Sequence, residues 1–204
     1  MKGQVRDTEQ SMRSGAVRGL RPGIRADAEA QAAVNIEELA SFLAMIASRE
    51  PNPDCIMFIC IGSDRSTGDA FGPLLGTMLK EQGWKHVIGT LEEPCDAHTV
   101  EAAASKAALM QDRDRMTVIA VDACLGKPQS VGGFIVKEGS LQPGVATGRR
   151  LPAVGDYSIA GVVNLYGVKA YGMLQTTSLH LVMGMVKAVA AAVQAAWLEE
   201  ASNG

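Results

Sequence analysis

The stretch CIMFICIGSDRSTGDAFGPLLG, residues 55–76, decides the fold class. It opens with seven apolar residues, Cys55–Ile61, which are too few for a helix and are followed by Gly62. Such a run is typical of a strand that is buried on both faces. A helix is then predicted over Asp69–Gln82, ending before Gly83. A buried strand that leads directly into a helix predicts a strand–helix unit of an α/β protein.

The same alternation continues along the chain. Further strands are predicted over His86–Leu91, Met116–Val121, Gly133–Lys137 and Lys169–Leu174, and further helices over Ile36–Ser48, Ala97–Met110, Ser158–Leu165 and Thr177–Glu200. Strands that alternate with helices favour a parallel, doubly wound sheet with helices on both faces. We therefore predict a three-layer α/β/α domain with a mostly parallel twisted sheet of about five strands, in which Gly133–Lys137 is an edge strand.

Composition narrows the function classes. The chain has 204 residues, of which 47% are hydrophobic and 20% are charged, as in an ordinary globular protein. Its net charge of −3 argues against nucleic acid as a partner, because nucleic-acid-binding proteins usually carry a basic face. No secretory signal is visible, and the most apolar stretch, 178–198, is interrupted by polar side chains. We expect a cytoplasmic protein with no membrane partner.

The first residues differ from the rest. Residues 1–25 are rich in arginine and glycine and have almost no apolar periodicity. We predict that residues 1–34 form a disordered basic head or a removable pro-segment, and that 35–204 form a single domain. A solvated tail, an over-extended start site and a phosphate-binding arm remain alternatives for the head.

The loop after the first strand matches no phosphate-binding or nucleophile motif. Ligands of open parallel sheets bind outside the carboxyl ends of the strands, so this loop, 62–73, is the first to consider. It contains no P-loop, no G-x-G-x-x-G and no G-x-S-x-G motif, which disfavours a nucleotide site and disfavours Ser63 and Ser66 as nucleophiles. Asp64, in the same loop, is a candidate supporting residue.

Two aspartates follow neighbouring predicted strands. Asp69 lies at the start of the helix after the first strand, and Asp122 directly follows the apolar run Met116–Val121. If the two carboxyl groups share one crevice, their repulsion raises one pKa and provides an acid–base pair that activates water. Alternatively, they are two oxygen ligands of a divalent cation. Purely structural roles are a helix N-cap for Asp69 and bonds to loop amides for Asp122.

Other polar residues at the same edge of the sheet are candidates for supporting roles. His98 and His180 lie at the starts of predicted helices, and each is a candidate base or ligand. The long loop 139–157 carries Arg149, which could bind a substrate carboxylate or carbonyl, and Asp156, which could cap the predicted helix at Ser158.

The motifs resemble those of a known family. The ordered set IGSDRSTGDAFGPLLG, GTLEEPCDAHTVE, VDACLG, LPAVGDYSIAGVVN and LQTTSLHLV is similar to the YyaC family of sporulation proteins, over about residues 55–195. That family is more distantly similar to the spore germination protease, whose two catalytic aspartates match Asp69 and Asp122. The segment from Gln142 to Arg150 also resembles a stretch of that protease.

The same two positions resemble acidic nickel contacts of hydrogenase maturation endopeptidases. The third contact of those enzymes is a histidine, and the matching segment here, Pro152–Asp156, has none. The resemblance therefore implies a hydrogenase-maturation-protease-like fold with an aspartate-based site rather than nickel recognition.

The resemblance implies a sporulation-associated peptidase in the mother cell or forespore, with Asp69 and Asp122 catalytic and without a cofactor. Small acid-soluble spore proteins are the implied protein substrates, and assembly with further copies of the chain stays open. Two alternatives remain: a catalytically silent binding or regulatory protein, and a divalent-metal hydrolase that uses Asp69, Asp122 and His98.

Overall fold

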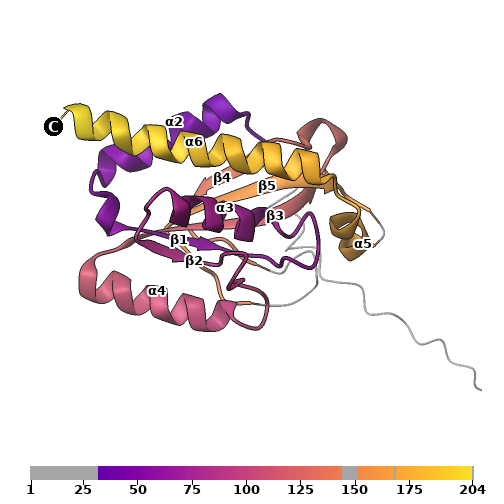
Figure 1. Ribbon diagram of the computed structural model, residues 1–204, viewed down its shortest axis with the longest axis horizontal. Helices are drawn as coiled ribbons and strands as arrows, with labels where there is room; N and C mark the ends of the chain where they lie inside the picture. Colours follow the sequence, from indigo (N-terminus) through magenta and orange to yellow (C-terminus); the bar gives the residue numbers. More distant parts are fainter. Residues whose placement is uncertain (1–31, 144–150, 168, 204) are drawn as a thin grey trace, which may run out of the picture.

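The computed structural model describes residues 32–143, 151–167 and 169–203. Their centre is one five-stranded sheet in the order β2-β1-β3-β5-β4 (Figure 1). The strands are β1 Ile56–Cys60, β2 His86–Ile88, β3 Thr117–Gly126, β4 Phe134–Glu138 and β5 Tyr157–Leu165. All neighbouring strands are parallel except β4, which lies antiparallel to β5 at one edge. The predicted mostly parallel sheet and its edge strand are confirmed.

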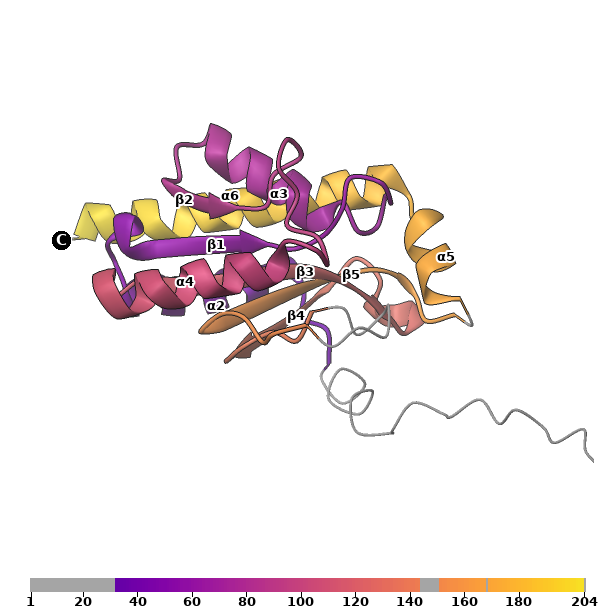
Figure 2. The same ribbon diagram turned by 90° about the horizontal axis from the view of Figure 1, so that it is seen from below.

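Helices cover both faces of the sheet (Figures 1 and 2). One layer contains α2 Ile36–Arg49, α3 Phe71–Glu81 and α6 Leu179–Asn203, and α4 Val100–Asp114 covers the other face. The remaining helical segments are η1 Pro53–Cys55, η2 Pro128–Ser130 and α5 Ala170–Gln175. Each face has its own apolar cluster, so the described chain has the predicted three-layer α/β/α architecture.

Alternation along the central strands assigns each side chain to a face. Val118 and Ala120 of β3 pack in the cluster beneath α4, whereas Ile119 and Val121 pack in the cluster beneath α2, α3 and α6. Because successive strand residues point to opposite faces, Asp122 projects on the same side as Ala120, toward the layer of α4.

The folded chain begins slightly before the predicted boundary. The N–H and C=O groups of Val34 exchange hydrogen bonds with Phe134 at the start of β4 (2.7 and 2.9 Å). Asn35 then caps α2 in a capping box with Glu38, which fixes where that helix starts. Val34, which was predicted to lie in the head, is therefore part of the fold, and residues 1–31 of the predicted head lie outside the described part of the chain.

The predicted types of two elements near the end of the chain, one helix and one strand, are both wrong. Residues 158–165, predicted as a helix, lie in strand β5, and residues 169–174, predicted as a strand, contribute to helix α5. β5 lies between β3 and β4 and is buried on both faces, so its apolar run does not alternate. A short run of this kind fits a buried strand and a buried helix equally well, and neighbouring strands decide between them.

The order of the strands places a topological switch point between β1 and β3. The chain leaves β1 through α3 to reach β2 on one side, then returns through α4 on the opposite face to β3 on the other side. Connections that leave neighbouring strands in opposite directions mark the topological switch point, where open α/β sheets bind their ligands. The loop after β1 and the end of β3 lie at this switch point.

Helix α6 contains a stretch, Leu179–Leu198, that is long and apolar enough to cross a membrane by length and composition alone. Half of that stretch is buried within the fold. Val182, Val186, Val189 and Val193 are fully buried in the cluster that α6 shares with α2 and α3. Packing within the domain therefore accounts for the apolar character of α6.

Candidate functional site

Asp122 lies inside β3, not after it. The prediction that the strand ends at Val121 was wrong, because β3 continues to Gly126. Pairing with β1, however, ends where Cys60 lies opposite Val121, so Asp122 is the first residue of β3 beyond the end of β1. The residue as a whole is half-buried, and Oδ1 accepts a hydrogen bond from the Ala123 N–H (2.8 Å). Asp122 therefore stands at the switch point of the sheet.

Asp69 lies in the loop after β1, near enough to Asp122 for its charge to act on that carboxyl group. Gly62 turns the chain away from the sheet with a φ of +145°, and a Cβ atom there would collide with the Asp69 carbonyl oxygen. That carbonyl accepts a hydrogen bond from the Ser63 N–H (3.2 Å), which closes the loop. The N-cap of α3 is Ala70, and no side chain caps this helix. The N-cap role considered for Asp69 is therefore wrong.

The two carboxyl groups interact electrostatically. Burial raises the pKa of Asp69 to about 6, while a hydrogen bond from the Ser63 backbone opposes this shift and the charge of Asp96 adds to it. Burial, and then the charge of Asp69, raise the pKa of Asp122 to about 8, against the hydrogen bond from Ala123. At neutral pH the pair therefore consists mainly of an ionised Asp69 and a protonated Asp122. One base and one acid thus lie at the same site.

Sequence reasoning missed three side chains around this pair. The charge of Asp122 contributes to the raised pKa values of Cys95 and Cys124, both about 12 and due mainly to burial. Cys124 is two residues from Asp122 on the same face of β3, and Cys95 lies beside Ile61 in an isolated parallel bridge. Asp96 adds negative charge near Asp69. Raised pKa values keep both thiols protonated at neutral pH, which disfavours them as nucleophiles.

The chain around α5 anchors the loop of Asp69. The Gly68 N–H donates to the Leu174 carbonyl (2.9 Å), and a Cβ on Gly68 would lie 2.7 Å from Thr177 Oγ1. Thr177 donates to the Met173 carbonyl (3.0 Å) and accepts from Asn164 at the end of β5 (3.3 Å). The run LQTTSLHLV contains Leu174 and Thr177, but the sequence alone did not indicate this anchoring role.

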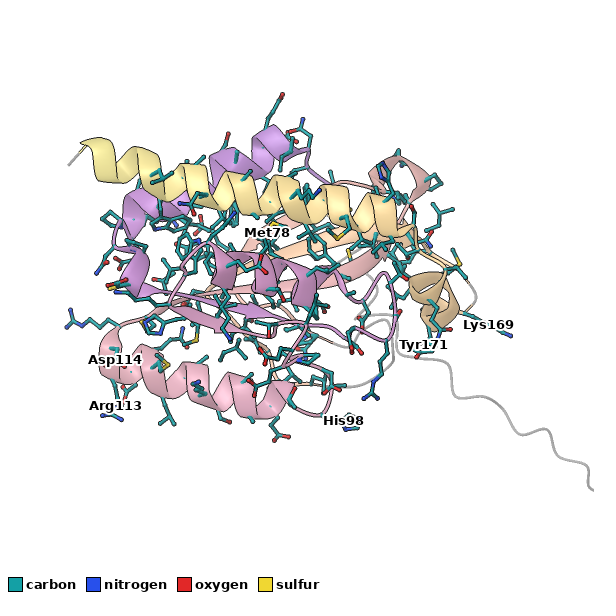
Figure 3. The ribbon with its side chains drawn as sticks, viewed as in Figure 1. Met78, His98, Arg113, Asp114, Lys169 and Tyr171 are labelled. Atoms are coloured by element: carbon teal, nitrogen blue, oxygen red, sulfur yellow. The ribbon has the colours of Figure 1, made fainter. Side chains whose placement is uncertain are left out.

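His98 does not join the aspartate pair. Its backbone N–H donates to Asp96 Oδ1 (2.8 Å), and its exposed side chain lies beyond the start of α4, on the outside of the molecule (Figure 3). Among the described residues no three histidine, cysteine or acidic side chains gather as metal ligands. The predicted ligand set of Asp69, Asp122 and His98 is therefore not assembled.

Asp156 lies at the opposite end of the sheet. No helix begins after it, so the predicted helix-capping role was wrong. Instead, its carboxylate accepts hydrogen bonds from the Val118 N–H near the start of β3 (2.9 Å) and from Gln111 (2.7 Å). Asp64 is exposed in the loop of Asp69. Arg149 lies outside the described residues.

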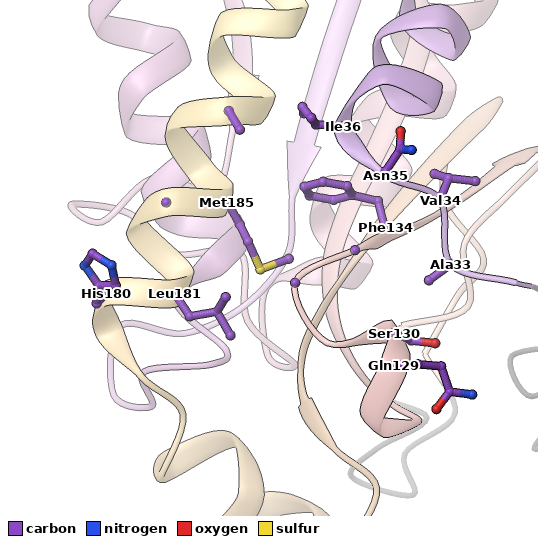
Figure 4. Close-up of a pocket in the computed structure, with 14 residues that line it drawn as sticks. Ala33, Val34, Asn35, Ile36, Gln129, Ser130, Phe134, His180, Leu181 and Met185 are labelled. Carbon is purple, nitrogen blue, oxygen red and sulfur yellow. The ribbon is translucent and has the colours of Figure 1, made fainter.

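His180 belongs to a different feature. It lines a groove of about 620 Å³ between the start of α6, residues 33–36 and the start of β4 (Figure 4). The floor is apolar and includes Phe134, Leu181 and Met185, and neither aspartate lines it. His180 therefore lines a groove to which neither Asp69 nor Asp122 contributes.

Comparisons with known proteins agree with the motifs. A family model described as "Protein of unknown function (DUF1256)" matches residues 27–192. The chain is 42% identical over 164 residues to a Bacillus subtilis (strain 168) protein named "Uncharacterized protein YyaC". The aligned residues cover 79% of this chain and 77% of that protein. Among solved structures, the chain is similar to the NiFe hydrogenase maturation protease HycI of Thermococcus kodakarensis KOD1. The TM-score is 0.47 and the sequence identity is 22%. The match covers 70% of this chain and 91% of the HycI chain. The family match includes both aspartates.

Proposed function

This chain belongs to the DUF1256 family and is a homologue of YyaC, as its motifs indicate, and we propose that it is a peptidase-like hydrolase in which Asp69 and Asp122 act on a bound peptide. The observation that carries the proposal is the position of both carboxyl groups at the β1–β3 switch point, where they interact. Asp69 does not cap α3, and the hydrogen bond that the Asp122 side chain accepts comes from its own neighbour, Ala123.

The different protonation states of the pair support a general acid–base mechanism. The ionised Asp69 carboxylate accepts a proton from a water molecule that attacks the peptide carbonyl carbon. The protonated Asp122 donates its proton to the nitrogen of the scissile bond as that bond breaks. The products are a carboxylic acid and an amine, and the pair returns to its starting state when the proton that Asp69 received is transferred to Asp122.

The surroundings of the pair support this division of roles. Asp122 is held protonated because its carboxyl group is withdrawn from water and faces the negative charge of Asp69. Burial raises the pKa of Asp69 less, to about 6, and a hydrogen bond from the Ser63 backbone opposes that shift. A general acid and a general base with pKa values on either side of 7 work best near neutral pH.

The substrate proposal rests on the resemblance of the motifs. Gly68–Pro73 and Val121–Cys124 resemble the two segments of the spore germination protease that carry its aspartates. We propose that the chain acts in the cytoplasm of the mother cell or forespore on a protein processed during sporulation. Small acid-soluble spore proteins are the first candidates.

Mass spectrometry of a small acid-soluble spore protein after incubation with the purified chain tests the proposal. Wild type is expected to cleave the spore protein. In Asp122→Asn and in Asp69→Asn, the cleavage rate is expected to fall at least about a hundredfold, because one general acid or base typically contributes that much. Asp114→Asn, an exposed aspartate at the end of α4, is the matched control and is expected to keep full activity.

Two further arms separate the alternatives. Cleavage that EDTA abolishes would favour a divalent-metal hydrolase over the acid–base pair. A panel of spore proteins and a peptide library that all stay intact would contradict the peptidase proposal and favour a binding or regulatory protein of the same fold.

A further inference from the structure

Exposed apolar side chains gather at the end of β5 and on α5. Leu165 at the end of β5, Tyr166 directly after it and Tyr171 of α5 are 37%, 46% and 57% exposed. They are three of the eight large hydrophobic side chains that are exposed among the described residues. Single exposed apolar residues are normal, whereas several in one place are typical of a binding surface. We call these three side chains the apolar rim.

One end of the apolar rim is attached to the loop of Asp69. The Gly68 N–H donates to the Leu174 carbonyl at the end of α5 (2.9 Å), so this helix contacts the residue directly before Asp69. Tyr171 precedes Leu174 by three residues, which is about 4.5 Å along a helix. The backbone of Tyr171 therefore lies within one helical turn of the contact with the Asp69 loop.

The other end of the apolar rim is attached to the strand of Asp122. The Tyr166 N–H donates to the carbonyl of Gly126, the last residue of β3 (2.9 Å). Asn164 donates to the Met173 carbonyl (2.8 Å), which holds the end of β5 against α5. α5 thus lies beyond the ends of β3 and β5 (Figure 1), and the apolar rim is at the same edge of the sheet as the aspartate pair.

Packing within the domain explains only one side of α5. Leu174 is buried in the cluster that includes α3 and α6, whereas Tyr171 lies on the outside of the molecule (Figure 3). A tyrosine offers a large apolar surface with few rotatable bonds, and its hydroxyl group can stay in water. Tyr171 is therefore accessible to a bound molecule and suited to recognise an apolar group.

We propose that the apolar rim, with Tyr171 as its most exposed member, binds a large apolar side chain of the peptide substrate. This inference rests on the proposed function and names its substrate class: peptides with a leucine-like or aromatic residue within a few positions of the scissile bond. A peptide at the aspartate pair extends over the adjoining rim, since both lie at one edge of the sheet.

The division of labour between the two features has a physical reason. The aspartate pair acts on the peptide bond, which is the same in every substrate, so it does not select among peptides. Burial of an apolar side chain against the apolar rim removes apolar surface of both partners from water and favours binding. Selection among peptides therefore depends on the rim, and the chemical step depends on Asp69 and Asp122.

Cleavage of a decapeptide library tests the inference. Mass spectrometry of the products identifies the cut sites, and wild type is expected to prefer a large apolar residue at one position near the cut. Two peptides that differ only there, with leucine or serine, then give a ratio of kcat/KM values. This ratio is expected to be at least about tenfold in wild type and below about threefold in Tyr171→Ser.

Three controls accompany this measurement. The serine peptide is expected to give the same kcat/KM with Tyr171→Ser as with wild type, because the aspartate pair is unchanged. Leu109→Ser replaces an apolar side chain of similar exposure (63%) on α4 and is expected to keep the wild-type ratio. Calorimetry with Asp122→Asn measures binding without cleavage, and the Kd of the leucine peptide is expected to rise at least about tenfold when Tyr171→Ser is added.

The outcomes separate this inference from the proposed function. Cleavage without an apolar preference would overturn the role of the apolar rim while the peptidase proposal stands. A preference that Tyr171→Ser leaves intact would do the same. A library that wild type does not cleave would overturn both.

Discussion

Asp69 ionises before Asp122, and its negative charge then keeps the Asp122 carboxyl group protonated. Asp69 has the lower pKa, about 6, and its charge contributes to the pKa of about 8 at Asp122. Asp122 is still neutral while Asp69 titrates, so the effect runs from the first group to the second. Like charges that share a buried site separate their pKa values in this way.

The first prediction concerns the pH dependence of cleavage. The mechanism needs Asp69 ionised and Asp122 protonated, so kcat/KM is expected to rise through about pH 6 and to fall through about pH 8. Initial rates at low substrate between pH 4 and 10 measure this profile. Carbon NMR of the Asp122 carboxyl group in Asp69→Asn is expected to show a lower pKa, and an unchanged value would contradict the coupling.

The second prediction concerns stability. Folding raises the pKa of Asp122 far above its unfolded value of about 3.9, so the folded state binds more protons than the unfolded state between about pH 4 and 8. The stability from this group is complete below pH 4 and is lost as pH rises through 8. Asp122→Asn removes the ionisation and keeps a side-chain oxygen for Ala123. Its free energy of unfolding is expected to exceed that of wild type by on the order of 2 kcal/mol or more at pH 8.5, and this difference is expected to shrink toward zero as the pH falls to about 4.

Urea unfolding at both pH values measures this difference. Asp114→Asn, at an exposed position, is expected to follow wild type at each pH. A variant Asp122→Asn that is less stable than wild type at pH 8.5 would show that the Asp122 carboxylate is stabilising and would refute the prediction.

The third prediction concerns Gly62. Gly62→Ala adds a Cβ that meets the Asp69 carbonyl, in a backbone conformation with φ of +145°. We expect a loss of stability greater than about 2 kcal/mol together with loss of cleavage, because the loop of Asp69 must shift. Gly83→Ala is the matched control: φ is +95°, but nothing lies within 4 Å of the added Cβ, so only the conformational cost of about 1 kcal/mol is expected. Equal melting temperatures for the two variants would contradict the steric argument.

The fourth prediction tests the anchoring of the Asp69 loop. Thr177→Val removes the hydroxyl that donates to Met173 and accepts from Asn164, at a buried position next to Gly68. We expect a loss of about 1–2 kcal/mol in stability and a lower kcat, since the loop is less well positioned. Thr176→Val removes a similar hydroxyl bond, to the Gly172 carbonyl (2.9 Å), at an exposed position and is expected to have little effect on either. Equal kcat values for the two variants would contradict an anchoring role.

The contrast between β5 and α5 shows where sequence patterns stop being informative. The apolar run over 158–165 was assigned to a helix and the segment 169–174 to a strand, and both assignments were wrong. Residues of β5 are buried by β3, β4 and the helices at once, so no period marks the segment. The identity of such an element depends on its neighbours, which local sequence does not contain.

The position of Asp122 shows the same limit within the site. The sequence identified Asp122 as a residue at the carboxyl edge of the sheet, but the strand continues past it. It lies at the switch point only because β1 ends earlier, opposite Val121. Likewise, the sequence predicted that His98 and Asp156 lie at the same edge of the sheet as the aspartate pair. In the structure, the His98 side chain lies on the outside of the molecule, and Asp156 lies at the opposite end of the sheet.

The amino-acid sequence by itself determined the α/β class, the mostly parallel sheet, the edge strand and the two aspartates as the candidate pair. These follow from local information: apolar runs, glycine-bounded loops, and acidic residues placed after strands. Tertiary structure alone decided which strand lies beside which, where β1 ends against β3, and how burial and the charge of Asp69 act on Asp122. The reason is physical: strand pairing and desolvation depend on residues far apart in the chain, and those contacts exist only once the sheet has formed.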